Sequence, residues 1–120
     1  MSNTHQLLNY SKLEDIAKDN TEFLLDVTQS YIDLIGQFKK DYQIACMSSD
    51  TKFFQEVTHK MKGSLRFMET HKLLYAVAEF REVFYEGTHT PEAVQGSIKH
   101  VNEICDQILA ILEEKKSGIA

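Results

Sequence analysis

Apolar residues recur every three or four positions along most of this chain, with polar residues between them. This spacing places apolar side chains on one face of an α-helix. The longest such run spans about six turns and contains Leu24, Val27, Tyr31, Leu34, Ile35, Phe38 and Tyr42. Asp19 and Glu22 have capping-box spacing, so we expect this helix to begin there. Gly36 lies inside the run, where we expect a close helix crossing.

Capping residues and a second apolar stripe predict one more helix before this run and one more after it. Ser11 with Glu14 predicts a short first helix over residues 12–18. Candidate caps for a third helix are Ser48, Ser49 and Asp50. The inward stripe of this third helix consists of Phe54, Val57, Met61, Leu65 and Met68.

The second half of the chain predicts two further helices. One begins near Thr70, ends near Gly87, and carries Leu73, Leu74, Val77, Phe80 and Phe84 on its apolar face. The other begins at Thr90, followed by Pro91 at the first helical position. Its apolar stripe contains Val94, Ile98, Val101, Cys105, Ile108 and Leu112.

Few residues interrupt these patterns, since the chain contains one proline and five glycines. Short connections make neighbouring helices antiparallel. We therefore predict an all-α fold, an antiparallel four-helix bundle with a short additional N-terminal helix. Residues 1–120 should form a single domain, with a flexible lead over 1–10 and a flexible tail over 115–120.

Composition and charge narrow the class of protein. The formal net charge of −5 argues against nucleic-acid binding over the whole surface. Cys46 and Cys105 lie in apolar stripes and form no CxxC pattern, so we expect buried thiols in a reducing compartment. No apolar run reaches the length of a membrane span, and the first residues do not resemble a signal peptide. We expect a soluble, cytoplasmic protein that does not act at a membrane.

The stretch "VTHKMKGSLRF", residues 57–67, places unusual chemistry on the third helix. His59 lies about 200° around the helix from Val57, so it should face away from the core. The helix-surface neighbours of this histidine are Gln55, Lys62, Gly63 and Arg66. Gly63 would leave bare backbone beside the imidazole, and Lys62 would bring a cation within one turn. Each feature alone is common on a solvated helix face, whereas their combination suits a phosphoryl-accepting histidine.

The segment "HKMKGSLRF", with the pattern H-x-hydrophobic-K-G-S, resembles the histidine-containing phosphotransfer domain of multistep phosphorelays. The resemblance covers nearly the whole chain and includes "NTEFLLDVTQSYI" and "LLYAVAEFREVFYEG". It implies that His59 is the phosphoacceptor, that Lys62 offsets phosphoryl charge and that Gly63 gives access. Ser64 matches the small residue after the glycine. Gln55, Lys60 and Arg66 would then shape the docking face.

The sequence also departs from that family. Leu65, Arg66 and Glu69 stand about where the family has small residues and a second glycine. The family often has a glutamine on the next helix that steadies the imidazole. Its counterpart here is near Arg81, so that role is not carried over.

The resemblance implies a phosphorelay intermediate that takes a phosphoryl group from a receiver-domain aspartate and passes it to another receiver. Its partners would be response-regulator receiver domains, including those of hybrid sensor histidine kinases, and the partner receiver would supply Mg²⁺. The chain has no P-loop or other ATP-binding pattern, so we expect a non-enzymatic carrier without a cofactor, acting as a monomer.

Other chemistry has less support in the sequence. The remaining histidines have no histidine or cysteine at i+3 or i+4, which argues against a helix-built metal site; they are His5, His71, His89 and His100. An alternative function is a helical docking or adapter bundle without phosphotransfer, favoured by Arg66 and Glu69. A kinase dimerisation or phosphatase domain is a weaker alternative, because Lys60 follows His59 where such domains have an acidic residue.

Overall fold

The computed structural model describes residues 7–87 and 89–119, and these ranges are all-helical, as predicted. They contain α2 (Ser11–Ala17), α3 (Thr21–Ser48), α4 (Thr51–Phe67), α5 (His71–Glu86) and α6 (Pro91–Ser117). Within these ranges, no helix has an apolar stretch long enough to cross a bilayer.

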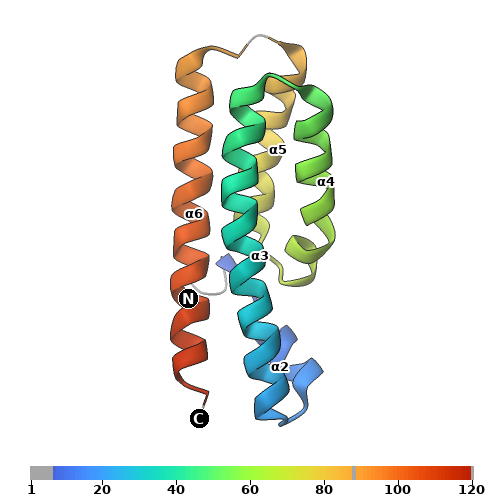
Figure 1. Ribbon diagram of the computed structural model, residues 1–120, viewed down its shortest axis with the longest axis vertical. Helices are drawn as coiled ribbons and strands as arrows, with labels where there is room; N and C mark the ends of the chain where they lie inside the picture. The colour runs from blue at the N-terminus through green and yellow to red at the C-terminus, as the bar shows by residue number, and fades with distance from the viewer. Residues whose placement is uncertain (1–6, 88, 120) are drawn as a thin grey trace.

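The long helices lie side by side, and each contacts two others (Figure 1). α3 packs against α4 and α6, while α5 packs against α4 and α6. α3 and α6 contain 28 and 27 residues, whereas α4 and α5 contain 17 and 16. Because α4 and α5 are shorter, they cover only one end of the α3–α6 pair. At the other end, α2 packs against α3 (Figure 1).

Three predicted helix ends are confirmed. The Asp50 side chain accepts hydrogen bonds from the backbone N–H groups of Lys52 and Phe53, and so caps α4. Thr90 caps α6 by accepting from the backbone N–H of Ala93 at 3.1 Å, and Pro91 is the first helical residue. Gly87 ends α5 with a φ of 70°, a backbone conformation that favours glycine.

Both predicted capping boxes are wrong. Ser11 is already helical, and its hydroxyl donates to the side chain of Asn9 rather than capping α2. α3 is capped by Asn20, whose Oδ1 accepts from the backbone N–H of Phe23 at 3.0 Å. Asp19 instead has a φ of 69° in the turn before it. Asn20, one residue after Asp19, caps the free backbone N–H of Phe23. The capping-box spacing therefore predicted the wrong capping residue.

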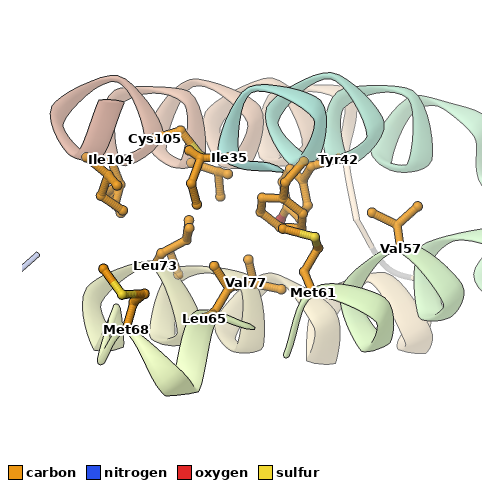
Figure 2. Packing of buried hydrophobic residues seen from close by; sticks show 14 of the residues in the cluster. Ile35, Tyr42, Val57, Met61, Leu65, Met68, Leu73, Val77, Ile104 and Cys105 are labelled. Atoms are coloured by element: carbon orange, nitrogen blue, oxygen red, sulfur yellow. The ribbon is translucent and has the colours of Figure 1, made fainter. Parts of the chain in front are cut away.

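The predicted apolar stripes meet in one core, and the stripe of α4 is buried along its whole length. Figure 2 shows Ile35 and Tyr42 of α3 with Cys105 of α6 on one side of this core, facing side chains of α4 and α5. Phe54 is fully buried and stacks on Phe84 with ring centroids 4.5 Å apart. Burial of these side chains fixes how each helix is rotated toward its neighbours.

Residues 7–10 are packed into the core, which does not fit the flexible lead that we expected. Leu7, Leu8 and Tyr10 are buried, and the backbone N–H of Asn9 donates to the carbonyl of Met68 at 2.7 Å. These side chains belong to the same hydrophobic core as the stripes of the long helices. At the other terminus, α6 continues to Ser117, into the expected flexible tail. Residues 1–6 and 120 lie outside the described residues.

Gly36 does not mark a close helix crossing, so that prediction is wrong. A Cβ atom added at this position would meet no atom within 4 Å outside the local helix. The two predicted buried thiols, by contrast, are confirmed as buried. Burial raises the pKa of Cys46 and of Cys105 to about 12, and both cysteines are free.

The turn between α4 and α5 is formed by Glu69, which has a φ of 56°. This position is where the resemblance places the second glycine, so glutamate adopts a conformation that glycine enters more easily. Its side chain accepts a hydrogen bond from Asn9 Nδ2 at 2.9 Å and lies 3.6 Å from Lys12 Nζ. The Thr70 hydroxyl donates to the Leu65 carbonyl at 2.7 Å. These contacts hold the turn and join it to the beginning of the chain.

The Glu69 contacts predict a specific pH dependence of stability. The hydrogen bond from Asn9 and, secondarily, the charge of Lys12 lower the pKa of Glu69 below its ordinary value. A lowered folded-state pKa stabilises the fold at pH values above the unfolded-state pKa, and this stability is lost as the pH falls through the folded-state pKa. Glu69→Gln should therefore reduce the loss of thermal stability between about pH 5 and about pH 3.

The measurement is the melting temperature of both chains across this pH range, followed by circular dichroism. Glu103→Gln changes an exposed carboxylate on α6 and serves as the control. It should leave the pH dependence as it is in the original chain. If the melting temperatures of Glu69→Gln and the original chain fall equally with decreasing pH, the turn contacts contribute no pH-dependent stability.

Candidate functional site

α4 presents its motif residues to solvent because its opposite face is anchored in the core. Val57, Met61 and Leu65 are buried, whereas His59 and Gly63 are exposed. The predicted orientation of the motif is thus confirmed. Four buried apolar side chains of α4 fix the rotation of the helix, and this rotation sets the direction in which the imidazole points.

Gly63 leaves an open surface beside His59. Among the described residues outside the local helix, a Cβ added at this position would meet no atom within 4 Å. The glycine is therefore not required by packing within the described residues. A larger body could approach the helix backbone here and reach the adjacent imidazole.

His59 lies in a groove of about 700 Å³ between α4 and α5. We call it the α4–α5 groove. The polar and aromatic residues of these two helices that line it are Gln55, Thr58, His59, Lys62 and Arg66 from α4, and His71, Tyr75, Arg81 and Tyr85 from α5. Phe38 of α3 also lines it. Tyr75 is 71% exposed, so the groove opens to solvent along α5.

The charges of the α4–α5 groove differ from those of the whole chain. Lys62, Arg66 and Arg81 line it, and none of the described lining residues is an aspartate or glutamate. The chain as a whole has 18 acidic and 13 basic residues. The groove is therefore a local concentration of positive charge on an acidic protein.

A second groove, of about 600 Å³, lies on the other side of α4, against α3. Its charged lining residues are Asp33, Asp41, Glu56 and Lys60, so carboxylates predominate there. α4 consequently separates a basic groove from an acidic one. Lys60 belongs to the acidic side and is not in the groove that holds His59.

Ser64 has a structural contact at the back of the motif. It is half-buried, and its backbone carbonyl accepts a hydrogen bond from the Tyr31 hydroxyl of α3 at 3.3 Å. Burial raises the pKa of Tyr31, with the contact to Ser64 acting in the opposite direction. The tyrosine thus ties α4 to α3 one residue after Gly63.

The structure brings some of the predicted site residues together and separates others. Gln55, His59, Lys62 and Arg66 line one groove, whereas Lys60 and Ser64 do not line it. The sequence analysis assigned no role to α5, although the resemblance placed Arg81 near the position of the glutamine that steadies the imidazole. The polar and aromatic residues that α5 contributes are His71, Tyr75, Arg81 and Tyr85. Their spacing along one side of α5 was the available signal, but each is an ordinary surface residue when taken alone.

Among residues 7–87 and 89–119, no group of three or more His, Cys, Asp or Glu side chains is placed to hold a metal ion. His59 and His71 share the α4–α5 groove, but no carboxylate or thiol lines it with them.

Comparisons of this chain with protein-family models, curated proteins and solved structures found no match. Membership of the phosphotransfer family therefore stays a prediction from the motif. The case for a function rests on the residues and the geometry of α4 and α5.

The open space at two helical glycines predicts how alanine should act there. Gly36→Ala and Gly63→Ala should each stabilise the fold by up to about 1 kcal/mol, because alanine is the better helix former and nothing opposes its methyl group. Gly87→Ala should destabilise the fold, because Gly87 has a positive φ. Urea denaturation of the three variants measures these changes. Destabilisation by Gly63→Ala would show that the glycine is needed for folding.

Proposed function

We propose that this protein is a phosphorelay intermediate that carries a phosphoryl group on His59. The main support for this proposal is the exposed imidazole of His59, which lies next to the open backbone of Gly63. The groove that holds this imidazole is lined by cations and by no described carboxylate. An exposed imidazole can meet a large partner, and the cations offset the charge that arrives with the phosphoryl group.

The transfer step follows from the chemistry of imidazole. The neutral ring nitrogen donates its lone pair to the phosphorus of a receiver's phospho-aspartate, in line with the leaving oxygen. A nitrogen–phosphorus bond forms, and the bond between phosphorus and the aspartyl oxygen breaks, with its electron pair leaving on the carboxylate. Transfer to a second receiver is the reverse reaction with another aspartate.

The residues around His59 would stabilise the phosphoryl group and contact the receiver. Lys62, one helical turn from His59, would offset the charge of the phosphoryl group, and Gly63 would admit the receiver. Gln55 and Arg66 would contact the receiver on the same face. Lys60 would contact it only if the receiver also covers the acidic side of α4, because it lines the other groove.

The proposed architecture is a single-domain antiparallel four-helix bundle with α2 as an additional N-terminal helix. The ring of contacts between α3, α4, α5 and α6 supports it. We further propose a cytoplasmic monomer whose partners are receiver domains, either separate or part of hybrid sensor kinases. The receiver would supply Mg²⁺, and this chain would need no cofactor of its own.

The first test is the position of the label after transfer. The full chain is incubated with a receiver that carries radiolabelled phospho-aspartate, and acid-labile, base-stable label is measured. His59→Gln should abolish this label because the attacking nitrogen is removed. His100→Gln, at an exposed position on α6, should keep it. Normal labelling of His59→Gln would refute the assignment of the phosphoacceptor.

The second test separates access from folding. Gly63→Gln should slow transfer strongly, because a long side chain would then cover the backbone beside His59. Gly36→Gln makes the same change at the other helical glycine with open space, and should leave transfer unchanged. Rates are compared in single-turnover reactions, and circular dichroism checks that both variants fold. Equal rates for the two variants would remove the steric role of Gly63.

An adapter without phosphotransfer is the second candidate function. Tyr75, Tyr85 and Phe67 are 71%, 45% and 42% exposed, so aromatic surface is available to a partner near the motif. Such an adapter would bind a receiver equally well with His59→Gln and would acquire no label. Receiver binding without any label on the original chain would favour this function.

A further inference from the structure

The positive charge of the α4–α5 groove has no ion-pair partner among residues 7–87 and 89–119. In the part of the chain that the structure describes, the ion pairs are Lys12–Glu69 and Lys39–Asp106. The side chains of Lys62, Arg66 and Arg81 make no hydrogen bond to a described residue. Placing like charges along one groove costs free energy, since they repel each other without a counter-charge. An anion bound between them would remove that cost.

Arg81 and Lys62 are both half-buried, whereas Arg66 is exposed. Of the two half-buried cations, Arg81 has the larger number of hydrogen-bond donors, because a guanidinium has five and an ammonium has three. Arg81 comes from α5, whereas Lys62 and Arg66 come from α4, so the cations approach the groove from both walls. The planar guanidinium can bind two oxygens of a phosphate at once, which a lysine cannot do.

We propose that the α4–α5 groove is a binding site for a phosphoryl group, in which Arg81 is the main ligand from α5 and Lys62 the main ligand from α4. Two sources can supply that group: a free phosphate or phosphomonoester, or the phosphoryl group on His59, which lines the same groove. The second source rests on the proposed function, whereas binding of a free anion does not. On a phosphorylated chain, Arg81 would join the phosphoryl group on α4 to the neighbouring helix.

The acidic groove on the other side of α4 determines toward which neighbouring helix an anion is drawn. Its carboxylates, Asp33, Asp41 and Glu56, would repel a phosphoryl group. An anion near α4 is therefore drawn toward α5 and away from α3. A group on the exposed imidazole of His59 would be held on the same side.

Free anions provide the first experiment. The full chain is titrated with phenyl phosphate at constant ionic strength, and amide and arginine side-chain NMR signals are followed. We expect saturable shifts at Arg81 and Lys62, and at least about tenfold weaker binding in Arg81→Gln. Arg81→Lys, which keeps the charge without the planar fork, should be intermediate.

Lys72→Gln is the matched control, because it removes one positive charge from an exposed position on α5 that does not line the groove. Its affinity should equal that of the original chain. Two results would overturn the site: no saturable shift in the original chain, or equal weakening by Lys72→Gln and Arg81→Gln, which would indicate only general electrostatic attraction. Thermal melts of each variant check folding.

The phosphorylated chain provides the second experiment. The ³¹P signal of phosphohistidine is followed against pH in the original chain and in Arg81→Gln. A nearby guanidinium favours the dianion, so its loss should raise the pH at which the phosphoryl group titrates. An unchanged titration would overturn the contact between Arg81 and the group on His59.

The two experiments keep this inference separate from the proposed function. Arg81-dependent binding of phenyl phosphate, together with no label from a phosphorylated receiver, would retain the site and refute the relay. Normal labelling of His59, together with phenyl phosphate binding that is unchanged in Arg81→Gln, would support the phosphorelay function and refute the proposed anion site.

Discussion

Burial of the apolar face of α4 is the constraint on which the rest of the site depends. Phe54, Val57, Met61 and Leu65 occupy the core, so the helix cannot rotate without exposing them to water. This fixed rotation points His59 outward and sets Gly63 beside it. The Tyr31 hydroxyl adds a second restraint through the Ser64 carbonyl. The chemistry of the exposed face is thus determined by residues that are themselves buried.

α4 is also a boundary between two electrostatic environments. The groove on its α5 side contains cations without carboxylates, and the groove on its α3 side contains mainly carboxylates. A helix has room for both because residues one or two positions apart point to different sides. Lys60 and Lys62 illustrate this point, since they belong to different grooves although only one residue separates them. A partner that covers His59 therefore meets an asymmetric surface.

The sequence predicted the helices and the buried face of α4 because both follow from periodicity within one segment. Asp50, Gly87 and Thr90 were recognised as helix-end signals because a cap also depends on residues within one short segment. Features that need distant residues were missed. Neither the packing of residues 7–10 against the end of α4 nor the position of Arg81 in the groove of His59 can be read from spacing along one helix. Gly36 was misinterpreted because a glycine in a helix does not reveal what lies opposite it.

The two cysteines lie on the longest helices, Cys46 on α3 and Cys105 on α6, and both are buried. Their raised pKa keeps them protonated near neutral pH, and burial excludes reagents. A thiol-reactive compound can therefore attack either one only while the surrounding core is open. The rate of alkylation would report how often the helices separate, without any engineered probe. These two thiols, which are not among the residues that line the α4–α5 groove, are therefore a built-in probe of core opening.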